Sequence, residues 1–301
     1  MRIIGAGLSG LLAGVLNENA EIHEPFIEQN SHQALLRFRS PDIGEAVGIP
    51  FKKVTAYKSI WHEGEHTPMN VMMMNKYSRK VSGKISHRSI RHTEAETRWM
   101  APEGFQDMLR NICESRIHYD AHIPSVLDYK GPIISTIPMN VLSRHLGTHH
   151  ILGKEIDIIK DTKAIYVTRY EISDCEAFMT IYYPELGLNV YRASISGNML
   201  IIECIKPMKE KDLTTVVNSF GICSYPITEH TLNFMQNNGK MSLINENVRK
   251  AFILNATLKH NIYSLGRFAV WKDILLDDVY HDIGRIKHFI NLSKYDHLKG
   301  T

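Results

Sequence analysis

Three glycines near the start of the chain have the spacing of a turn that holds a phosphate group. Gly5, Gly7 and Gly10 form the pattern G-x-G-x-x-G directly after a short apolar run. In such a turn the first glycine permits the tight bend, the second lets the backbone approach a pyrophosphate, and the third lets the following helix pack closely on the strand. The start of that helix, which includes Ser9, faces the anion. The pattern predicts a dinucleotide-binding strand, turn and helix.

A carboxylate follows this turn at the distance expected of a ribose ligand. Residues 20–24 read as a second strand, which ends at Glu24, 19 positions after Gly5. In dinucleotide-binding folds an acidic side chain about 20 residues after the turn accepts hydrogen bonds from the ribose hydroxyls. Glu24 is the candidate, and Glu28 replaces it if the strand runs further.

The composition fits an ordinary globular protein that is long enough to form two lobes. Of the 301 residues, 44% are hydrophobic and 22% are charged, which excludes the disordered, collagen-like and disulfide-rich classes. A formal net charge of +3 gives no strong indication of nucleic-acid binding, although a local basic patch would leave that partner open. No ligand set has the usual spacing of a metal site, so no metal is expected.

The hydrophobic residues are also too dispersed for a membrane protein. No apolar stretch reaches the roughly 20 residues that span a bilayer, and the first residues do not read as a signal peptide. We expect a cytoplasmic protein without a membrane partner.

A second glycine turn lies near the other end of the sequence. Residues 261–271 read as a strand that runs into Gly266 and Arg267, and residues 275–289 have the apolar spacing of a helix. This unit resembles the C-terminal flavin-contacting segment of the FAD enzymes that include UDP-galactopyranose mutase, protoporphyrinogen oxidase and the amine oxidases, with the mutase match the closest. Trp271, Lys272 and Asp277 hold further positions of that segment.

The resemblance implies that FAD is the cofactor. It also implies that the start of the final helix, residues 276–278, directs backbone amides at the flavin, so that Asp277 and Asp278 lie beside the cofactor. Lys272 is carried over from the same segment as a candidate catalytic residue.

Two more segments resemble the same enzymes. Residues 131–139, with Thr136 and Pro138, are similar to the strand and turn by which these enzymes return to the FAD domain from an inserted lobe. Residues 35–40 follow the candidate ribose residue, where related flavoenzymes cross beneath the flavin with an arginine and a Gly-Gly pair. The Gly-Gly pair is absent here, which leaves the loop geometry open. Arg37, Arg39 and Ser40 are predicted contacts of FAD or substrate.

Together these segments predict an α/β fold, with a Rossmann-like FAD-binding domain (GR2 type) and an inserted antiparallel-sheet substrate lobe. We expect residues 1–42, 117–148 and 255–301 to form the FAD-binding domain. Residues 43–116 and 149–254 then form the lobe, whose second part contains β-rich runs separated by turn residues.

One strand of the expected lobe carries a candidate substrate ligand. Tyr191 and Arg192 resemble the tyrosine-arginine strand of the mutase family, whose arginine meets substrate phosphate near the flavin. A guanidinium is suited to phosphate or carboxylate because it offers paired donors in one plane. Arg192 is therefore a candidate catalytic or anchoring residue, and the alternative is a solvated surface arginine.

Three functions follow from these resemblances. Residues 31–40, 47–52 and 75–83 also resemble small FAD/NAD(P)-binding proteins of bacteriophages, some of which take part in thymidine hypermodification with a flavin-dependent lyase. The first function is thus an FAD-dependent oxidase or lyase for an amine or amino-acid-type group on a small molecule, a nucleotide or modified DNA, in the host cytoplasm if a phage encodes it. The second is a redox-neutral UDP-sugar mutase, and the third is a non-catalytic FAD-binding protein.

Overall fold

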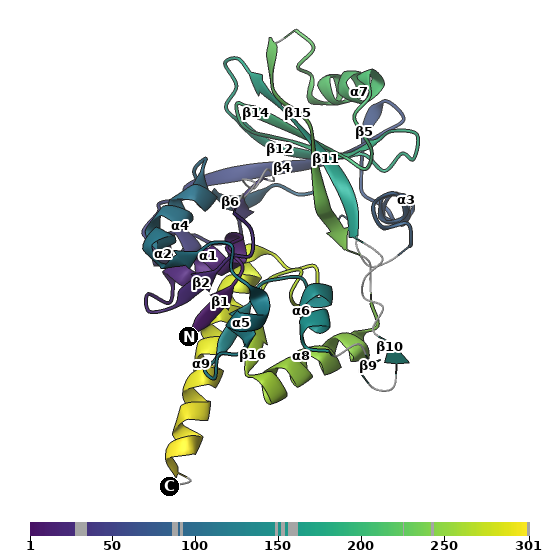
Figure 1. The fold of residues 1–301 in the computed structure, drawn as a ribbon. Helices are drawn as coiled ribbons and strands as arrows, with labels where there is room; N and C mark the ends of the chain where they lie inside the picture. Colours follow the sequence, from purple (N-terminus) through teal and green to yellow (C-terminus); the bar gives the residue numbers. More distant parts are fainter. Residues whose placement is uncertain are drawn as a thin grey trace.

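In a computed structural model the chain forms a Rossmann-like unit below a large sheet lobe (Figure 1). The structure describes residues 1–27, 35–85, 90, 93–147, 150–151, 154–155, 162–224, 226–241 and 244–299. Its elements are β1 (Arg2–Ile4), α1 (Leu8–Val15), β2 (Glu21–His23), β3 (Arg37–Phe38), α2 (Asp42–Val47), β4 (Lys52–His62), β5 (Glu65–Thr67), α3 (Val71–Ser82), β6 (Glu96–Met100), α4 (Phe105–Cys113), η1 (Glu114–Arg116), β7 (Ile117–His118), α5 (Ile123–Leu127), β8 (Ile133–Ser135), α6 (Met139–His145), β9 (His150–Ile151), β10 (Lys154–Glu155), β11 (Thr162–Ile172), β12 (Ala177–Tyr182), β13 (Val190–Gly197), β14 (Met199–Cys204), α7 (Glu210–Phe220), β15 (Ile227–Met241), α8 (Glu246–His260), β16 (Ile262–Ser264) and α9 (Leu276–Lys299).

The Rossmann unit is a five-stranded parallel sheet in the order β16-β8-β1-β2-β7. Its strands are short apolar runs because helices cover both faces. Ile3 points into a core shared with α1, α4 and α9, and Ile4 points into a second core shared with α5, α6 and α8. The carboxyl ends of these parallel strands therefore lie at one edge of the sheet, where the loops can build a ligand site.

The lobe is a nine-stranded sheet in the order β15-β11-β14-β13-β12-β4-β6-β3, with β5 paired on β4. The pairing is antiparallel except between β12 and β4, which run parallel. Side chains alternate across the sheet: one face packs on α7 and the other packs in part on α3. The predicted fold class, an α/β Rossmann-like unit with an inserted and mainly antiparallel lobe, is confirmed.

Three helices that were expected in the lobe pack on the Rossmann sheet instead. Phe105 and Leu109 of α4, and Ile43 of α2, share the core of α1. Phe252 of α8 is fully buried in the core on the other face. The expected boundaries at 42/43, 116/117 and 254/255 therefore need correction, because each of these helices buries its apolar face on the Rossmann unit.

Among the described residues, no helix has both the length and the apolar character that a membrane crossing requires.

Candidate functional site

The glycine turn has the shape that close contact with a phosphate group requires. Gly5 has φ +97°, and a Cβ on Gly10 would lie 1.8 Å from the carbonyl oxygen of Gly5, so both positions exclude a side chain. Gly7 differs, because a Cβ there would meet nothing within 4 Å and its φ of −72° is ordinary. Among the described residues, none fills the space beside Gly7 at the start of α1.

The loop after β8 supports this turn from the neighbouring strand. The hydroxyl group of Thr136 donates a hydrogen bond to the carbonyl oxygen of Ile4 at 2.8 Å. The same Oγ1 atom lies 3.3 Å from the carbonyl oxygen of Gly5. A Cβ on Gly5 would clash with this same hydroxyl. Pro138 then stands at the N-cap of α6. The structure thus places Thr136 as a brace of the turn; its contact with a cofactor remains a prediction.

Glu24 lies at the end of β2 and is buried beneath the turn. One carboxylate oxygen accepts a hydrogen bond from the backbone of Ala6 at 2.6 Å, and the other accepts one from the backbone of Phe26 at 3.1 Å. Each oxygen keeps a second lone pair for a hydroxyl donor. The fallback, Glu28, lies outside the described residues.

The C-terminal glycine turn meets the start of α1. Gly266 has φ +91°, and a Cβ on it would lie 2.6 Å from Oγ of Ser9. Arg267 follows, with its guanidinium 3.3 Å from the carboxylate of Asp273 and over the ring of Phe268. The two glycine turns found in the sequence therefore form one continuous surface.

Arg39 connects the segment after β3 to the start of α9. Its backbone N–H donates to Asp277 at 2.8 Å and its guanidinium donates to Asp278 at 2.5 Å. Asp278 also accepts from the backbone of Leu275, which caps the helix. Burial works against the charged form of Asp278, but the Leu275 N–H and Arg39 outweigh it and lower the pKa of the carboxyl. Ser40, the residue after Arg39, is half-buried.

Arg37 reaches into the lobe. Its guanidinium donates to the carbonyl oxygen of Ile195 and lies 3.5 Å from the hydroxyl of Thr180. Burial, followed by the positive charge of Arg192, lowers the pKa of Arg37 to about 10. Adjacent residues of a strand point to opposite sides, so Phe38 packs in the Rossmann core while Arg37 points to the lobe sheet. The contact of Arg37 with FAD or substrate stays a prediction.

Arg192 is held in an ion pair on the same face of the lobe. It donates two hydrogen bonds to the carboxylate of Glu203, its partner across the β13–β14 pair, and Tyr191 donates a third at 2.9 Å. Burial of Glu203 opposes ionisation, but Arg192 and Lys240 outweigh it and lower the pKa of the carboxyl. Arg192 is therefore half-buried and paired with a carboxylate, unlike the solvated surface arginine that was the alternative.

Lys272 lies on the exposed loop between β16 and α9. Its backbone N–H donates to the carbonyl oxygen of Arg267, and its side chain faces solvent. The structure shows no bond from this side chain to the glycine turns within the described residues, and its catalytic role stays a prediction.

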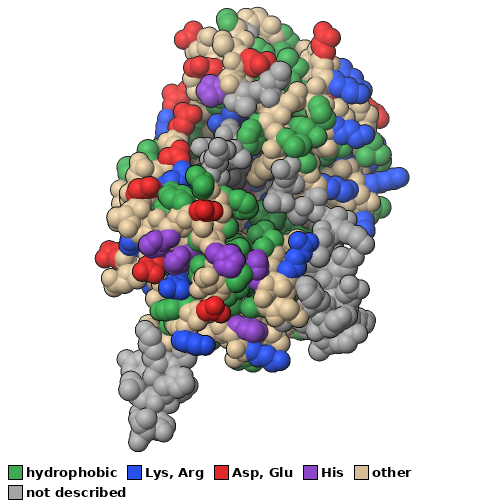
Figure 2. Space-filling model, viewed as in Figure 1, with side chains coloured by type: hydrophobic (Ala, Val, Ile, Leu, Met, Phe, Trp, Pro, Cys, Tyr) green, Lys and Arg blue, Asp and Glu red, His purple; other side chains and the backbone are tan. Residues whose placement is uncertain are grey.

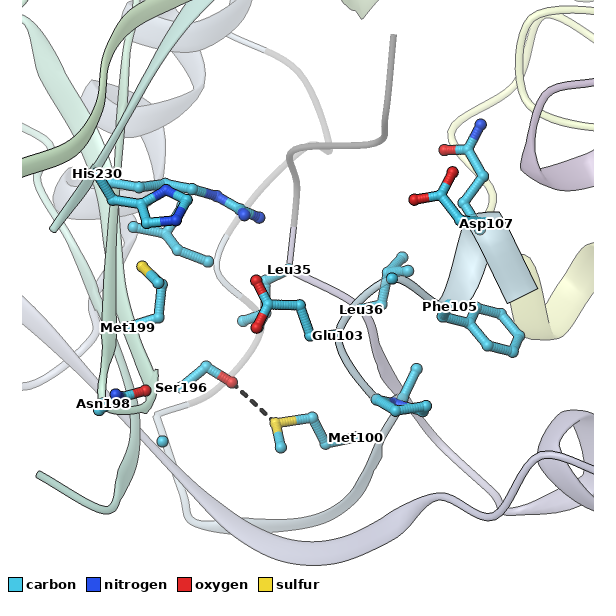
Figure 3. A pocket seen from close by; sticks show the side chains of 17 residues that line it. Leu35, Leu36, Met100, Glu103, Phe105, Asp107, Ser196, Asn198, Met199 and His230 are labelled. Atoms are coloured by element: carbon cyan, nitrogen blue, oxygen red, sulfur yellow. Dashed lines mark hydrogen bonds between the residues drawn. The ribbon is translucent and has the colours of Figure 1, made fainter. Parts of the chain in front are cut away.

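A pocket of about 500 Å³ lies between the start of α4 and the lobe (Figure 3). We call it the inter-unit pocket. Figure 2 shows that this face of the molecule is hollowed between the two units and that hydrophobic side chains gather around the hollow. The residues that line the pocket are Leu35, Leu36, Met100, Ala101, Pro102, Glu103, Gly104, Phe105, Gln106, Asp107, Arg169, Ser196, Gly197, Asn198, Met199, Ile201 and His230.

None of these lining residues was a candidate site residue from the sequence. Arg169 reaches the pocket because it pairs with Ile201 across β11 and β14, and Glu103 reaches it because α4 begins beside the β13–β14 hairpin. Both relationships depend on strand register and on the packing of the two units. No local pattern in the sequence encodes them.

The fold is similar to that of several solved proteins. It matches a crystal structure of reduced UDP-galactopyranose mutase with a TM-score of 0.68 and 14% sequence identity, over 97% of this chain and 95% of that chain. A protein from Pyrococcus furiosus matches with a TM-score of 0.58 and 11% identity, over 97% and 98% of the two chains. An oxidoreductase from Methanosarcina mazei matches with a TM-score of 0.54 and 8% identity, over 95% and 99%.

The sequence itself matches no protein-family model and no curated protein. The structural similarity covers nearly the full length of each protein compared, so both the sheet unit and the lobe are shared. At these identities the chain is shown to have the same Rossmann-like fold with a sheet lobe.

Proposed function

We propose that this chain binds FAD along its two glycine turns and is an enzyme that uses the flavin on a small substrate held against the lobe. The observation that carries the proposal is the contact between the turns, in which Gly266 lies against Ser9 at the start of α1. A dinucleotide such as FAD needs one site for its pyrophosphate and a second site on the protein for the flavin at its other end. This contact provides one continuous surface for both.

The residues of that surface fit the parts of FAD. The start of α1 beside Gly7 offers backbone N–H groups to a pyrophosphate, where no side chain of the described chain intrudes. Glu24 offers carboxylate lone pairs to ribose hydroxyls. The start of α9, held by Arg39, presents a helix N-terminus, which favours a polar or negatively charged group of the cofactor.

The proteins of similar fold support a redox cofactor. One is described as a reduced UDP-galactopyranose mutase and another as an oxidoreductase. When bound, a flavin supplies a hydride acceptor for a C–H bond next to an amine nitrogen. The chain's own residues would bind the substrate, orient this bond and exclude water from it.

The finer form of the proposal is oxidation of an amine or amino-acid-type group, with an aminoacyl-modified thymidine as one substrate of that class. Its support is the inter-unit pocket, whose charged side chains of both signs are suited to such a group. To reach an aminoacyl-modified thymine in DNA, the enzyme would need that nucleotide to lie outside the stacked bases, by flipping or in a single strand.

A second function, redox-neutral transfer within a UDP-sugar, is favoured by one specific observation. Arg37 and Arg192 lie on the same lobe face, and the positive charge of Arg192 adds to burial in lowering the pKa of Arg37. A diphosphate would compensate two neighbouring guanidinium groups. Against this function, Arg192 already donates to Glu203.

The visible spectrum of the purified protein tests the proposal directly. We expect oxidised-flavin absorption, or its appearance on addition of FAD, and bleaching by dithionite. Bleaching of the flavin by an amine or amino acid supports the oxidase. Turnover of UDP-galactose that occurs only after the flavin has been reduced supports the mutase. A protein that takes up no flavin contradicts both.

A further inference from the structure

Phe26 is a large aromatic residue on the surface just after β2. Its side chain is 68% exposed, which places it among the most exposed large hydrophobic residues that the structure describes. Single apolar side chains are common on protein surfaces, so exposure by itself does not mark a site. What distinguishes Phe26 is its connection to Glu24, the residue proposed to hold the ribose of FAD.

The backbone of Phe26 is fixed relative to this carboxylate. The N–H of Phe26 donates to Oε1 of Glu24 at 3.1 Å, while Oε2 accepts from Ala6 in the glycine turn at 2.6 Å. Pro25 lies between Glu24 and Phe26, and its ring fixes one of the backbone torsion angles of this bend. The Glu24 carboxylate thus ties Phe26 to the glycine turn, and the place of the aromatic residue is set before a ligand binds.

The strand order decides which end of a dinucleotide reaches Phe26. The strand that leads into α1, β1, lies in the middle of the order β16-β8-β1-β2-β7 (Figure 1). The turn with Gly266 follows β16 on one side of β1, and Glu24 follows β2 on the other side. With the pyrophosphate at the start of α1 and the flavin toward Gly266, the adenosine end extends over the end of β2.

An exposed aromatic ring suits the base at that end. Adenine is flat, and the stacking of a base on an aromatic side chain is favourable because each offers a π face. In FAD the adenine is attached directly to the ribose whose hydroxyls would bond to Glu24. Phe26 follows Glu24 by two residues and is held by the same carboxylate. The ring is therefore on the part of the surface that the base would cover.

We infer that Phe26 stacks on the adenine of bound FAD and so helps the protein to select FAD over FMN, which lacks the adenosine monophosphate part. The inference rests on the proposed function, because it takes FAD to be the ligand of the two glycine turns. It assigns Phe26 a role in cofactor binding and no step of the reaction.

Two flavins separate an effect on the base from an effect on the flavin end. The full chain, freed of flavin, is titrated with FAD and with FMN, and flavin fluorescence gives the two dissociation constants. We expect Phe26→Ala to weaken FAD at least about tenfold, as is typical for the loss of one stacked base, and to change FMN less than about twofold. Equal weakening of the two flavins, or no weakening of FAD, would overturn the inference.

ADP is the complementary probe because it carries adenine, ribose and pyrophosphate without a flavin. We expect Phe26→Ala to weaken ADP by the same factor as FAD. Phe26→Trp restores an aromatic ring and should bind both ligands as the wild type does, and the emission that the new indole adds should be quenched by ADP. An ADP dissociation constant that Phe26→Ala leaves unchanged contradicts stacking, even where FMN binds too weakly to be measured.

Phe289→Ala is the matched control. Phe289 is also an exposed phenylalanine, on α9 well beyond the start of that helix. Its replacement removes the same apolar ring from the surface and should leave the constants for FAD, FMN and ADP unchanged. If Phe289→Ala weakens FAD as much as Phe26→Ala does, the assignment of the base to Phe26 is wrong.

The wild type separates this inference from the proposed function. A wild-type protein that binds neither FAD nor ADP contradicts the proposed function and the inference with it. A protein that binds FAD with the same affinity in the wild type and in Phe26→Ala contradicts the inference alone.

Discussion

Ser9 and Gly266 touch across the carboxyl edge of the Rossmann sheet, so closely that a Cβ on Gly266 would lie 2.6 Å from the hydroxyl oxygen of Ser9. Strand β8 lies between the strands that precede these residues. The turn after β16 therefore crosses over β8 to reach α1. This crossing brings the turn after β16 and the start of α1 into one continuous surface.

Substitution of Gly266 tests how tightly this contact is built. Gly266→Ala is expected to lower the free energy of unfolding by about 3 kcal/mol. The new Cβ would clash with Ser9, and alanine would be strained at the positive φ of this position. Urea denaturation measures the change. A loss of less than about 0.5 kcal/mol would contradict the packing described here.

Substitution of Gly7 should act on the cofactor and leave the fold unchanged. Gly7 has an ordinary φ and open space around its missing side chain, so Gly7→Val is expected to keep the melting temperature within about 2 °C. A valine there would occupy the position of the pyrophosphate, and flavin absorption should be lost. Absorption at 450 nm after gel filtration checks this.

Two other glycines serve as controls for Gly7. Gly187→Val places the same side chain in open space far along the sequence and should retain flavin. Gly10→Ala should unfold the turn itself, because its Cβ would overlap the carbonyl oxygen of Gly5. Full flavin retention by Gly7→Val would rule out the phosphate site.

The Arg192–Glu203 pair makes a prediction about stability. Arg192→Met leaves the carboxylate of Glu203 buried without its main partner, which should cost about 3 kcal/mol. The double variant Arg192→Met with Glu203→Leu should recover most of this loss. A fully stable single variant would instead indicate an arginine that serves only a ligand.

Lys80 predicts a pH dependence of folding. Its ammonium donates to the carbonyl oxygens of Tyr183 and Val190, and burial lowers its pKa to about 7 from 10.5. Above pH 7 the unfolded chain holds this proton and the folded chain does not, so the free energy of unfolding rises with pH. Below pH 7 both states hold the proton and the effect is constant.

The rise is measured as a difference between proteins. From pH 7 to 8.5 the wild type should gain up to about 1 kcal/mol per pH unit relative to Lys80→Met, and Lys250→Met, an exposed control, should follow the wild type. The window stops there because burial raises the pKa of the thiol of Cys204 and of the hydroxyl of Tyr183, which has the opposite effect at higher pH. Parallel curves for Lys80→Met and wild type would contradict the assignment.

The sequence predicted the parts of the fold that depend on local chemistry. Gly5 and Gly10 were recognisable because only glycine fits a tight turn against a strand, and Gly266 because it belongs to a second such turn. Arg39, Asp277 and Asp278 were each predicted near the cofactor from their own segments, and the structure bonds Arg39 to both carboxylates. Their contact with a cofactor stays a prediction. In each case a few consecutive residues carry the signal.

The rest depends on contacts that no short segment encodes. Arg37 differs from Arg39 by two positions, yet it bonds to the lobe because β3 pairs at the edge of the lobe sheet. Helix α8 was divided by an expected boundary because its apolar face is recognisable as part of the Rossmann core only when Ile4 and Ile262 lie beside Phe252. Arg169 and Glu103 meet across two units.

The parallel pairing of β4 with β12 has a consequence for how the chain folds. These neighbours in the lobe sheet come from opposite sides of the segment that contains β7 and β8, so the lobe cannot close before residue 182 is available. The Rossmann sheet in turn receives β16 only after the lobe strands have been made. On the ribosome all strands of the lobe sheet are therefore made before the Rossmann sheet is complete, and a fragment that ends before residue 262 should lack a folded Rossmann unit. Synthesis of the whole chain is thus a condition for a stable product.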